Sequence, residues 1–191
     1  MLNFFGIQAF FVLGTTVLTQ GKGVSFGSAL IVLIITNVGA FLGYLSHGFV
    51  GDYLGRRLTI AGGWMIGGLV FTIMLFGPNS GAFVIPMYAI GLFFLNGPYA
   101  ALLFYMVESF PACTRGTGVA FAHSMGPIGT IVGSALITAI LGAGLPMTVA
   151  AFIGGALGMF LSGLCMLGCR DVQDLREAEA LSEEEAAPRT G

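Results

Sequence analysis

The feature that most constrains this chain is a series of long apolar stretches. Between Leu58 and Val107 there is no charged residue. A helix that crosses a membrane needs about 20 mainly apolar residues, and hydrocarbon does not tolerate open strands. Six stretches qualify, the first a few residues short, as if the chain began inside its helix: residues 3–19, 27–50, 57–76, 82–107, 117–142 and 146–168. The sequence therefore predicts an all-α membrane protein, a six-transmembrane-helix bundle over residues 1–170.

Composition supports a surface that faces lipid. Charged residues make up 8% of the chain, whereas soluble domains carry about 25%. The net charge is −2, which gives no basic face for nucleic acid. The three cysteines form neither a zinc-like pair nor a disulfide framework. We therefore expect membrane lipid as a partner, and no nucleic acid, metal or cofactor.

The positions of Lys and Arg predict the topology, because cytoplasmic loops are enriched in both. Six arginines lie in the second loop, the fourth loop and the tail, and Lys22 alone lies in the odd-numbered loops. This predicts cytoplasmic N- and C-termini and an inner, plasma-membrane location. Residues 171–191 carry seven acids and few apolar side chains, which predicts a solvated, disordered cytoplasmic tail.

The second loop has a distinctive pattern of glycine and charge. It runs from Gly48 through Asp52 and Gly55 to Arg56 and Arg57. This G-x-x-x-D-x-x-G-R-R spacing between two membrane helices resembles the signature loop of the major facilitator superfamily. The residue after the aspartate is commonly basic in that family and is Tyr53 here, which removes one charge contact without moving the turn.

The fourth loop resembles the same family independently. From Glu108 to Gly118 it is similar to the E-x-[FY]-P-x-x-x-R-x-x-G segment of metabolite–proton symporter and sugar-porter-like branches, with Arg115 as the basic residue. The resemblance implies that these helices form the C-terminal half of a carrier. The next helix reads Gly126-Pro127 where many relatives carry an arginine, so an anion-binding arginine is not implied. The sugar-porter motif after the last helix is also absent.

The two loops together suggest a latch that closes the cytoplasmic gate. We expect Asp52 near the N-terminus of the fifth helix, around Thr117, and Arg56 near Glu108. Alternating access is the rocking of two bundles about a central site, and such contacts would favour the outward-open state. For Arg57 and Arg115, simple anchoring at the inner membrane face is a serious alternative.

Polar residues inside the membrane mark candidates for the solute pathway, because burying them in lipid is costly. They are Gln8, Asn37, Asn96 and His123. Asn96 precedes Gly97-Pro98, where we expect a broken helix with exposed backbone. His47 is expected at the membrane interface instead. No carboxylate lies between the membrane faces, so a proton site on an acid would belong to a missing N-terminal half.

These observations predict one bundle of a secondary active transporter, a symporter in type, for a small polar metabolite such as an organic acid or a sugar-like solute. The alternative is an inactive or scaffolding remnant of a carrier. A second bundle, either the missing half or a second copy, would complete the cavity. The glycine–serine pattern of a rhomboid-like protease is absent from the sequence, so we expect no catalytic residues and no enzymatic activity.

Overall fold

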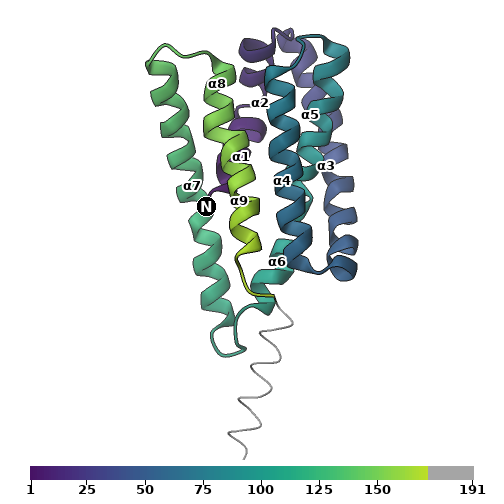
Figure 1. Cartoon of the computed structure of the whole chain (residues 1–191), viewed down its shortest axis with the longest axis vertical. Coiled ribbons are helices and arrows are strands. Elements are labelled where there is room, and N and C mark those ends of the chain that lie inside the picture. The colour runs from purple at the N-terminus through teal and green to yellow at the C-terminus, as the bar shows by residue number, and fades with distance from the viewer. Residues whose placement is uncertain (172–191) are drawn as a thin grey trace, which may run out of the picture.

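The computed structural model describes residues 1–171, apart from the side chain of Ile35. The acidic tail predicted from residue 171 onward thus lies almost wholly outside the described residues. Within them the chain is helical throughout, which confirms the all-α prediction (Figure 1). The elements are α1 (Asn3–Gly6), η1 (Ile7–Val12), α2 (Gly14–Thr16), η2 (Val17–Gly21), α3 (Phe26–Leu54), α4 (Arg56–Phe76), α5 (Gly81–Asn96), α6 (Pro98–Glu108), α7 (Arg115–Gly142), α8 (Met147–Ala151), η3 (Phe152–Ala156) and α9 (Leu157–Leu167).

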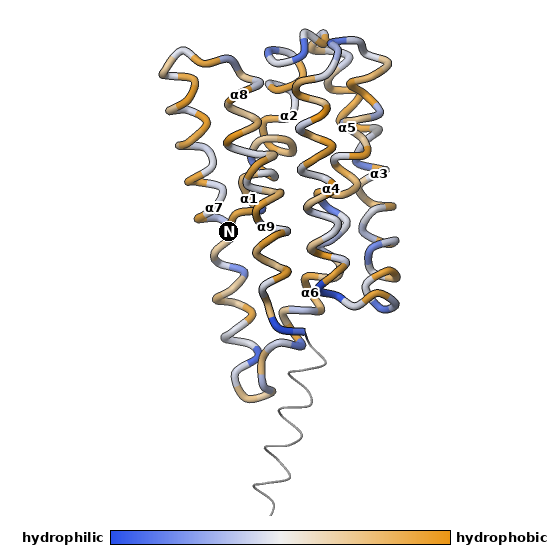
Figure 2. The backbone as a smooth tube through the Cα atoms, in the orientation of Figure 1, coloured by the Kyte–Doolittle hydropathy of each residue, from blue (hydrophilic) through white to orange (hydrophobic). Residues whose placement is uncertain are grey.

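Five helical spans in the described residues are long and apolar enough to cross a membrane, or six if a bent pair at the start counts as one. Figure 2 shows that hydrophobic residues dominate these spans and that hydrophilic ones gather near their ends. The five are α3, α4, α5 with α6, α7, and α8 through α9. The chain is therefore a multi-pass membrane protein.

The first span departs from the continuous helix expected over residues 3–19. It consists of two segments, Asn3–Val12 and Gly14–Gly21, that meet at 66°. A widened turn precedes the bend, in which the Leu13 amide donates to the Gln8 carbonyl at 3.0 Å; such turns mark local distortions of helices. The Tyr88 hydroxyl donates to the Phe10 carbonyl beside the bend, and Gly14 leaves room for that hydroxyl.

The third and sixth spans form the centre of the bundle. Their apolar windows are 56% and 50% buried, whereas those of α3 and α7 are 29% and 22% buried. A side chain at Gly68 would collide with the backbone of the sixth span near Ala156, so glycine permits α4 and the sixth span to approach closely. Figure 1 shows α3 and α7 on opposite sides of this centre. The second and fifth spans therefore carry most of the surface left open.

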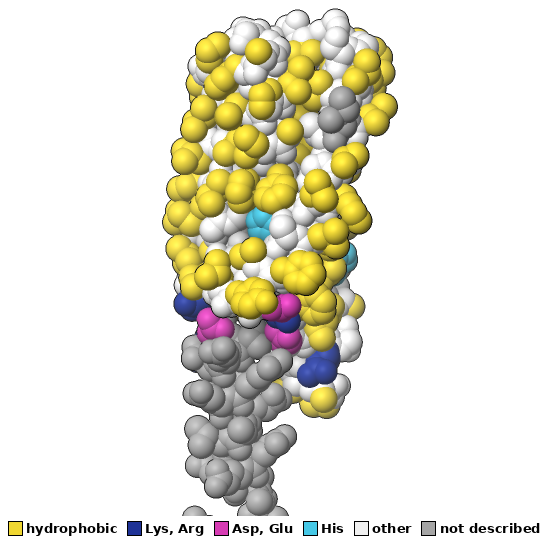
Figure 3. Space-filling view, turned by 90° about the vertical axis from the view of Figure 1, so that its right-hand side faces the viewer, with side chains coloured by type: hydrophobic (Ala, Val, Ile, Leu, Met, Phe, Trp, Pro, Cys, Tyr) yellow, Lys and Arg dark blue, Asp and Glu magenta, His cyan; other side chains and the backbone are white. Residues whose placement is uncertain are grey.

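The two ends of the bundle differ in charge. Arg56, Arg57, Glu108 and Arg115 lie at one end, which we call the arginine end; Figure 3 shows charged side chains gathered at the lower end of the face it presents. At the opposite Lys22 end, the buried Lys22 ammonium donates to the Gly77 carbonyl at 2.8 Å and to Asn79 Oδ1 at 3.0 Å. Desolvation lowers the pKa of Lys22. This lysine joins the loops after the first and third spans.

Candidate functional site

The signature loop is a turn of minimal length between α3 and α4. Gly55 alone separates the two helices and has φ +84°, a left-handed conformation that glycine adopts without strain. One turn earlier, Gly51 lets α3 pack against Ala101 of α6. The glycines of the motif thus serve a reversal of the chain and a close helix contact. These two glycines place Asp52 and Arg56 beside α6.

Arg56 is the centre of the contacts at the arginine end. Its Nε donates to Glu108 Oε2 at 2.7 Å, and its Nη2 lies 3.3 Å from Asp52 Oδ1. Its guanidinium carbon stands 4.5 Å from the centre of the Phe104 ring, an arrangement that adds a cation–π attraction. The Arg56 and Glu108 side chains are only 18% and 20% exposed. The expected proximity of Arg56 to Glu108 is therefore present, and it fastens the start of α4 to the end of α6.

Arg57 secures a different element. Its Nη1 donates to the Cys169 carbonyl at 2.9 Å, and its Nε lies 3.9 Å from Asp171 Oδ2. The Tyr105 hydroxyl donates to the neighbouring Arg170 carbonyl at 2.8 Å. A cation is favourable at the C-terminal end of a helix, where carbonyls lack helical partners. Arg57 thus ties the end of the sixth span to the signature loop, a contact that positive-inside anchoring alone does not explain.

Asp52 is not near the N-terminus of the fifth span, contrary to our expectation. Its partner is Arg56, four residues later, and its side chain is 62% exposed. The expected neighbour, Thr117, lies on α7, which Figure 1 places on the side of the bundle opposite α3. The distance between these flanking helices is the physical reason for the error. A contact between Asp52 and a fifth helix would need the fifth helix of another bundle.

The fourth loop is organised by packing and one hydrogen bond. The Phe110 ring lies over Gly118, where any side chain would collide with it. The Arg115 Nε donates to the Phe110 carbonyl at 3.3 Å. Glu108, two residues before Phe110, pairs with Arg56. The motif from Glu108 to Gly118 therefore fixes both the end of α6 and the start of α7.

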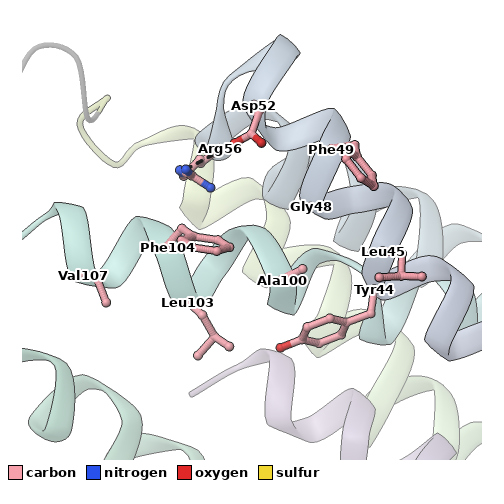
Figure 4. Close-up of a pocket in the computed structure, with 10 residues that line it drawn as sticks. All are labelled: Tyr44, Leu45, Gly48, Phe49, Asp52, Arg56, Ala100, Leu103, Phe104 and Val107. Atoms are coloured by element: carbon pink, nitrogen blue, oxygen red, sulfur yellow. Dashed lines mark ion pairs between the residues drawn. The ribbon is translucent and has the colours of Figure 1, made fainter.

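Three hollows open along the surface formed by α3, α6 and α7. The first, about 620 Å³, lies between α3 and α6 at the arginine end (Figure 4). The second, about 490 Å³, lies between α6 and α7 and shares Leu103 and Val107 with the first. The third, about 460 Å³, shares His123 with the second and reaches Thr130 and Phe4. Shared residues thus join the hollows into one route, which we call the open face.

The lining of the open face comes from the first, second, fourth and fifth spans and the first residue of α4. Its polar and charged members are Asp52 and Arg56 in the first hollow, Arg115 in the second and His123 in the second and third, with Tyr44 and Thr130 added by the structure. Gly48 lines the first hollow.

His123 is the one proposed pathway residue that lines these hollows. Its side chain is exposed. Pro127, which follows four residues later inside α7, lacks the amide hydrogen that would bond to the His123 carbonyl. His123 therefore offers both an imidazole and a backbone carbonyl in the middle of the route. The His-x-x-x-Pro spacing carries this signal in the sequence.

The three amide candidates lie elsewhere. Asn37 is exposed on α3 and donates to the Leu33 carbonyl of its own helix at 2.6 Å. Asn96 is half-buried and donates to the Leu92 carbonyl at 3.3 Å. Gln8 is buried in the first span, facing Gly133 of α7. At Asn96-Gly97-Pro98 the helix is interrupted in its hydrogen bonding only: α5 ends at Asn96 and α6 begins at Pro98, but Gly97 keeps helical torsions of φ −52° and ψ −53°, and residues 81–108 form one span.

We expected His47 at the membrane interface, but its side chain is buried inside the bundle. It is 7% exposed, and its Nδ1 lies 2.9 Å from the Gly43 carbonyl. The imidazole fills the space left by Gly97 of the α5–α6 break and by Gly63 of α4. Sequence position suggested the membrane edge, but the two distant glycines create an internal space for the ring.

Among the described residues, no three histidine, cysteine or acidic side chains gather as a metal site would require. The chemistry available on the open face is therefore hydrogen bonding and charge from Asp52, Arg56, Arg115, His123 and Thr130, set in an apolar lining. Such a surface is suited to binding and passing on a small polar solute.

Comparisons with known proteins agree with this description. The profile of the Major Facilitator Superfamily matches residues 1–190. The chain is 33% identical over 115 residues to the cis,cis-muconate transport protein of Acinetobacter baylyi, covering 60% of this chain and 28% of that protein. It is 30% identical over 141 residues to the niacin transporter of the same organism, covering 72% and 30%. It is 29% identical over 147 residues to the gentisate transporter of Corynebacterium glutamicum, covering 74% and 32%. The chain thus spans about a third or less of these relatives.

Proposed function

The chain belongs to the major facilitator superfamily, and from that premise we propose that it forms one bundle of a secondary active transporter that carries a small organic acid. The relatives named above are transporters of muconate, niacin and gentisate. The observation that carries the proposal is the open face, a route of joined hollows that starts at the Arg56 ion pairs and passes His123. Transport in this family is not catalysis, and we assign no enzymatic residue.

A second bundle completes the cavity in this proposal. It is supplied by an N-terminal half or by a second copy of the chain. The support is the low burial of α3 and α7, which flank the open face. In carriers of this kind two bundles rock about a site between them, so the faces that meet the partner are expected to be open in a single bundle.

The arginine end lies in the cytoplasm of this plasma-membrane carrier in our proposal, with both termini on that side. Six of the seven Lys and Arg residues lie in the second loop, the fourth loop and the tail, and this excess of positive charge on one side supports the orientation. Arg56 and Glu108 then hold the inner gate of this bundle together, and Gly48, Gly55 and Arg57 place the loop that carries them. The exposed Asp52 carboxylate is left to meet the opposing bundle, as a latch that biases the outward-open state.

Transport in liposomes tests the proposal. The purified chain is reconstituted alone and together with a separately expressed N-terminal bundle of a relative, and uptake of benzoate and cis,cis-muconate is measured. Uptake by the chain alone supports a pair of identical bundles, and uptake only with the added bundle supports a half-carrier. No uptake in either preparation would leave the inactive-remnant alternative.

Variants of α7 link uptake to the open face. His123→Gln removes the imidazole from the second and third hollows, and we expect it to lower uptake at least several-fold. Ser124→Ala is the matched control, because Ser124 is a neighbouring exposed residue that donates to the Phe121 carbonyl of its own helix. Equal uptake by both variants would contradict a route through the open face.

A further inference from the structure

A second group of polar side chains lies away from the hollows, at the junction of three spans. Asn3 of α1, Trp64 of α4 and Tyr99 of α6 meet inside the bundle, and Asn3 Nδ2 lies 2.8 Å from the Tyr99 hydroxyl. The Trp64 and Tyr99 rings meet edge to face at 5.7 Å, and Phe4 approaches Tyr99 at 6.0 Å. We call Asn3, Trp64 and Tyr99 the polar trio.

Two atoms of the polar trio are buried without a partner. They are Asn3 Oδ1 and Trp64 Nε1, on side chains that are 3% and 5% exposed. A buried polar group without a partner is destabilising, and in a membrane no bulk solvent relieves it. Neither atom belongs to the contacts of the arginine end or to the open face described above. Two unpartnered buried atoms therefore lie within one cluster of side chains.

Of the two unpartnered atoms, Asn3 Oδ1 is an acceptor and Trp64 Nε1 is a donor. As the bond is drawn, the Tyr99 oxygen accepts from Asn3, so the Tyr99 hydrogen and the Trp64 N–H are both free to donate. If the Asn3 amide is turned, Tyr99 donates to its oxygen, and the Asn3 amide hydrogens and the Trp64 N–H are free instead. Either arrangement leaves at least two donors from different helices. A carboxylate, with two oxygens, satisfies such a pair.

The surroundings define the rest of the ligand. The aromatic rings of Phe4, Trp64 and Tyr99 bound the trio, which favours a flat, unsaturated molecule. Figure 4 shows the Tyr44 hydroxyl, at the inner end of the first hollow, pointing toward the ribbon of the first residues of the chain. Tyr99 follows directly after the interruption at Gly97-Pro98. A change in the angle between α5 and α6 would thus open the trio toward the first hollow.

We propose that the polar trio is a carboxylate subsite that binds the acid group of a small unsaturated or aromatic acid through neutral donors. It rests on the proposed transport function and adds a way to hold an anion without an arginine in the membrane. Neutral donors suit a carrier, because a charge–charge pair would hold the solute more tightly and slow its release. The hollows described above do not reach the trio, so the proposal includes a movement of Tyr44 and Tyr99 that opens it.

Trp64 is the only tryptophan of the chain, so its fluorescence reports directly on the subsite. The chain in lipid nanodiscs is titrated with benzoate and, for comparison, with benzylamine, which has the same ring and the opposite charge. We expect a saturable change with benzoate alone. Tyr99→Phe, which removes one donor, should weaken the benzoate response about tenfold, the effect of losing one charge-assisted hydrogen bond.

Two further variants test whether the fluorescence response comes from the subsite. Tyr53→Phe is the matched control, because Tyr53 is the most exposed tyrosine at the end of α3, and it should leave the response unchanged. Asn3→Asp keeps the shape of the side chain but adds a negative charge, and it should abolish benzoate binding. Circular dichroism and thermal unfolding establish that each variant is folded before titration.

The outcomes separate this inference from the transport proposal. A response that is absent, or equal in Tyr99→Phe and Tyr53→Phe, would overturn the subsite and identify the trio as packing around a buried water. If benzoate is taken up by liposomes while Trp64 does not respond, the subsite fails and the transport function stands. If Trp64 responds in the expected pattern while no preparation transports, the subsite stands and the transport function fails.

Discussion

The two ends of the bundle are held together by different kinds of contact. At the arginine end, Arg56 joins two acids from two other helices, and one of them, Asp52, stays largely exposed. At the Lys22 end, one buried ammonium donates to neutral oxygens of Gly77 and Asn79. Ion pairs near water respond to salt and to a competing charge, whereas a buried bond to carbonyls does not. This contrast indicates that the contacts at the arginine end are the ones that rearrange during transport.

The largest expected effect comes from Arg56. Arg56→Met removes the cation from the Arg56–Glu108 pair, in which the Glu108 side chain is 20% exposed. Removing one partner of a buried ion pair costs about 3–5 kcal/mol. Because both side chains here are partly exposed, the cost is smaller, and we expect a loss of about 2 kcal/mol in the free energy of unfolding. Unfolding of the chain in mixed detergent micelles measures it. High salt should reduce the difference between the variant and the natural chain.

A double variant checks the cause of that loss. Arg56→Met combined with Glu108→Leu removes both charges, and more than half of the stability should return, because no uncompensated carboxylate remains. If the double variant is as unstable as the sum of the two single variants, the Arg56 contribution is packing against Phe104 and the ion-pair account of this end is wrong.

Lys22 gives the next largest effect. Lys22→Met keeps the length of the apolar stem but leaves the Gly77 carbonyl and the Asn79 side chain without their donor. We expect a loss of about 1–2 kcal/mol in the free energy of unfolding, the net contribution of hydrogen bonds from a charged donor to a half-buried and an exposed acceptor. The loss should be the same at low and high salt, since the partners are neutral. A strong salt dependence would remove the contrast between the two ends.

The sequence predicted features that depend on neighbours along the chain. The long apolar spans, the Gly55 turn and the break at Gly97-Pro98 follow from composition, glycine and proline, which act within one or two helical turns. Arg56 and Glu108 were paired through the family resemblance of their two loops, and they lie 2.7 Å apart.

Features that depend on distant residues were not predictable. The bend in the first span involves a hydroxyl on Tyr88, 78 residues beyond the carbonyl of Phe10 to which it donates. The burial of His47 depends on glycines of two other helices. Asn37 and Asn96 were chosen for their polarity, but helical geometry lets each bond to a carbonyl of its own helix, which a list of polar residues does not reveal.

Arg57 is expected to have a smaller and more local effect. Arg57→Met removes the donor to the Cys169 carbonyl and the charge opposite Asp171. We expect a loss of about 1 kcal/mol and faster hydrogen exchange at the end of α9, with little change at the start of α4. Tyr105→Phe, which loses the bond to the Arg170 carbonyl, should resemble it. Exchange that rises equally throughout the bundle would show that Arg57 supports the whole arginine end.

The smallest effect on stability is expected for Asp52, and it tests the contrast most directly. The carboxylate is 62% exposed and pairs with Arg56 across the Gly55 turn, and so exposed an ion pair falls at the lower end of the about 0–1 kcal/mol that surface pairs contribute. Asp52→Asn keeps the size of the side chain, and Arg56 keeps Glu108, so the free energy of unfolding should fall by less than about 0.5 kcal/mol. Uptake in liposomes that contain both bundles should nevertheless change, because the exposed charge is proposed to contact the opposing bundle. If stability falls as far as in Arg56→Met while uptake per folded molecule is unchanged, Asp52 is an internal support of this bundle and not part of a latch.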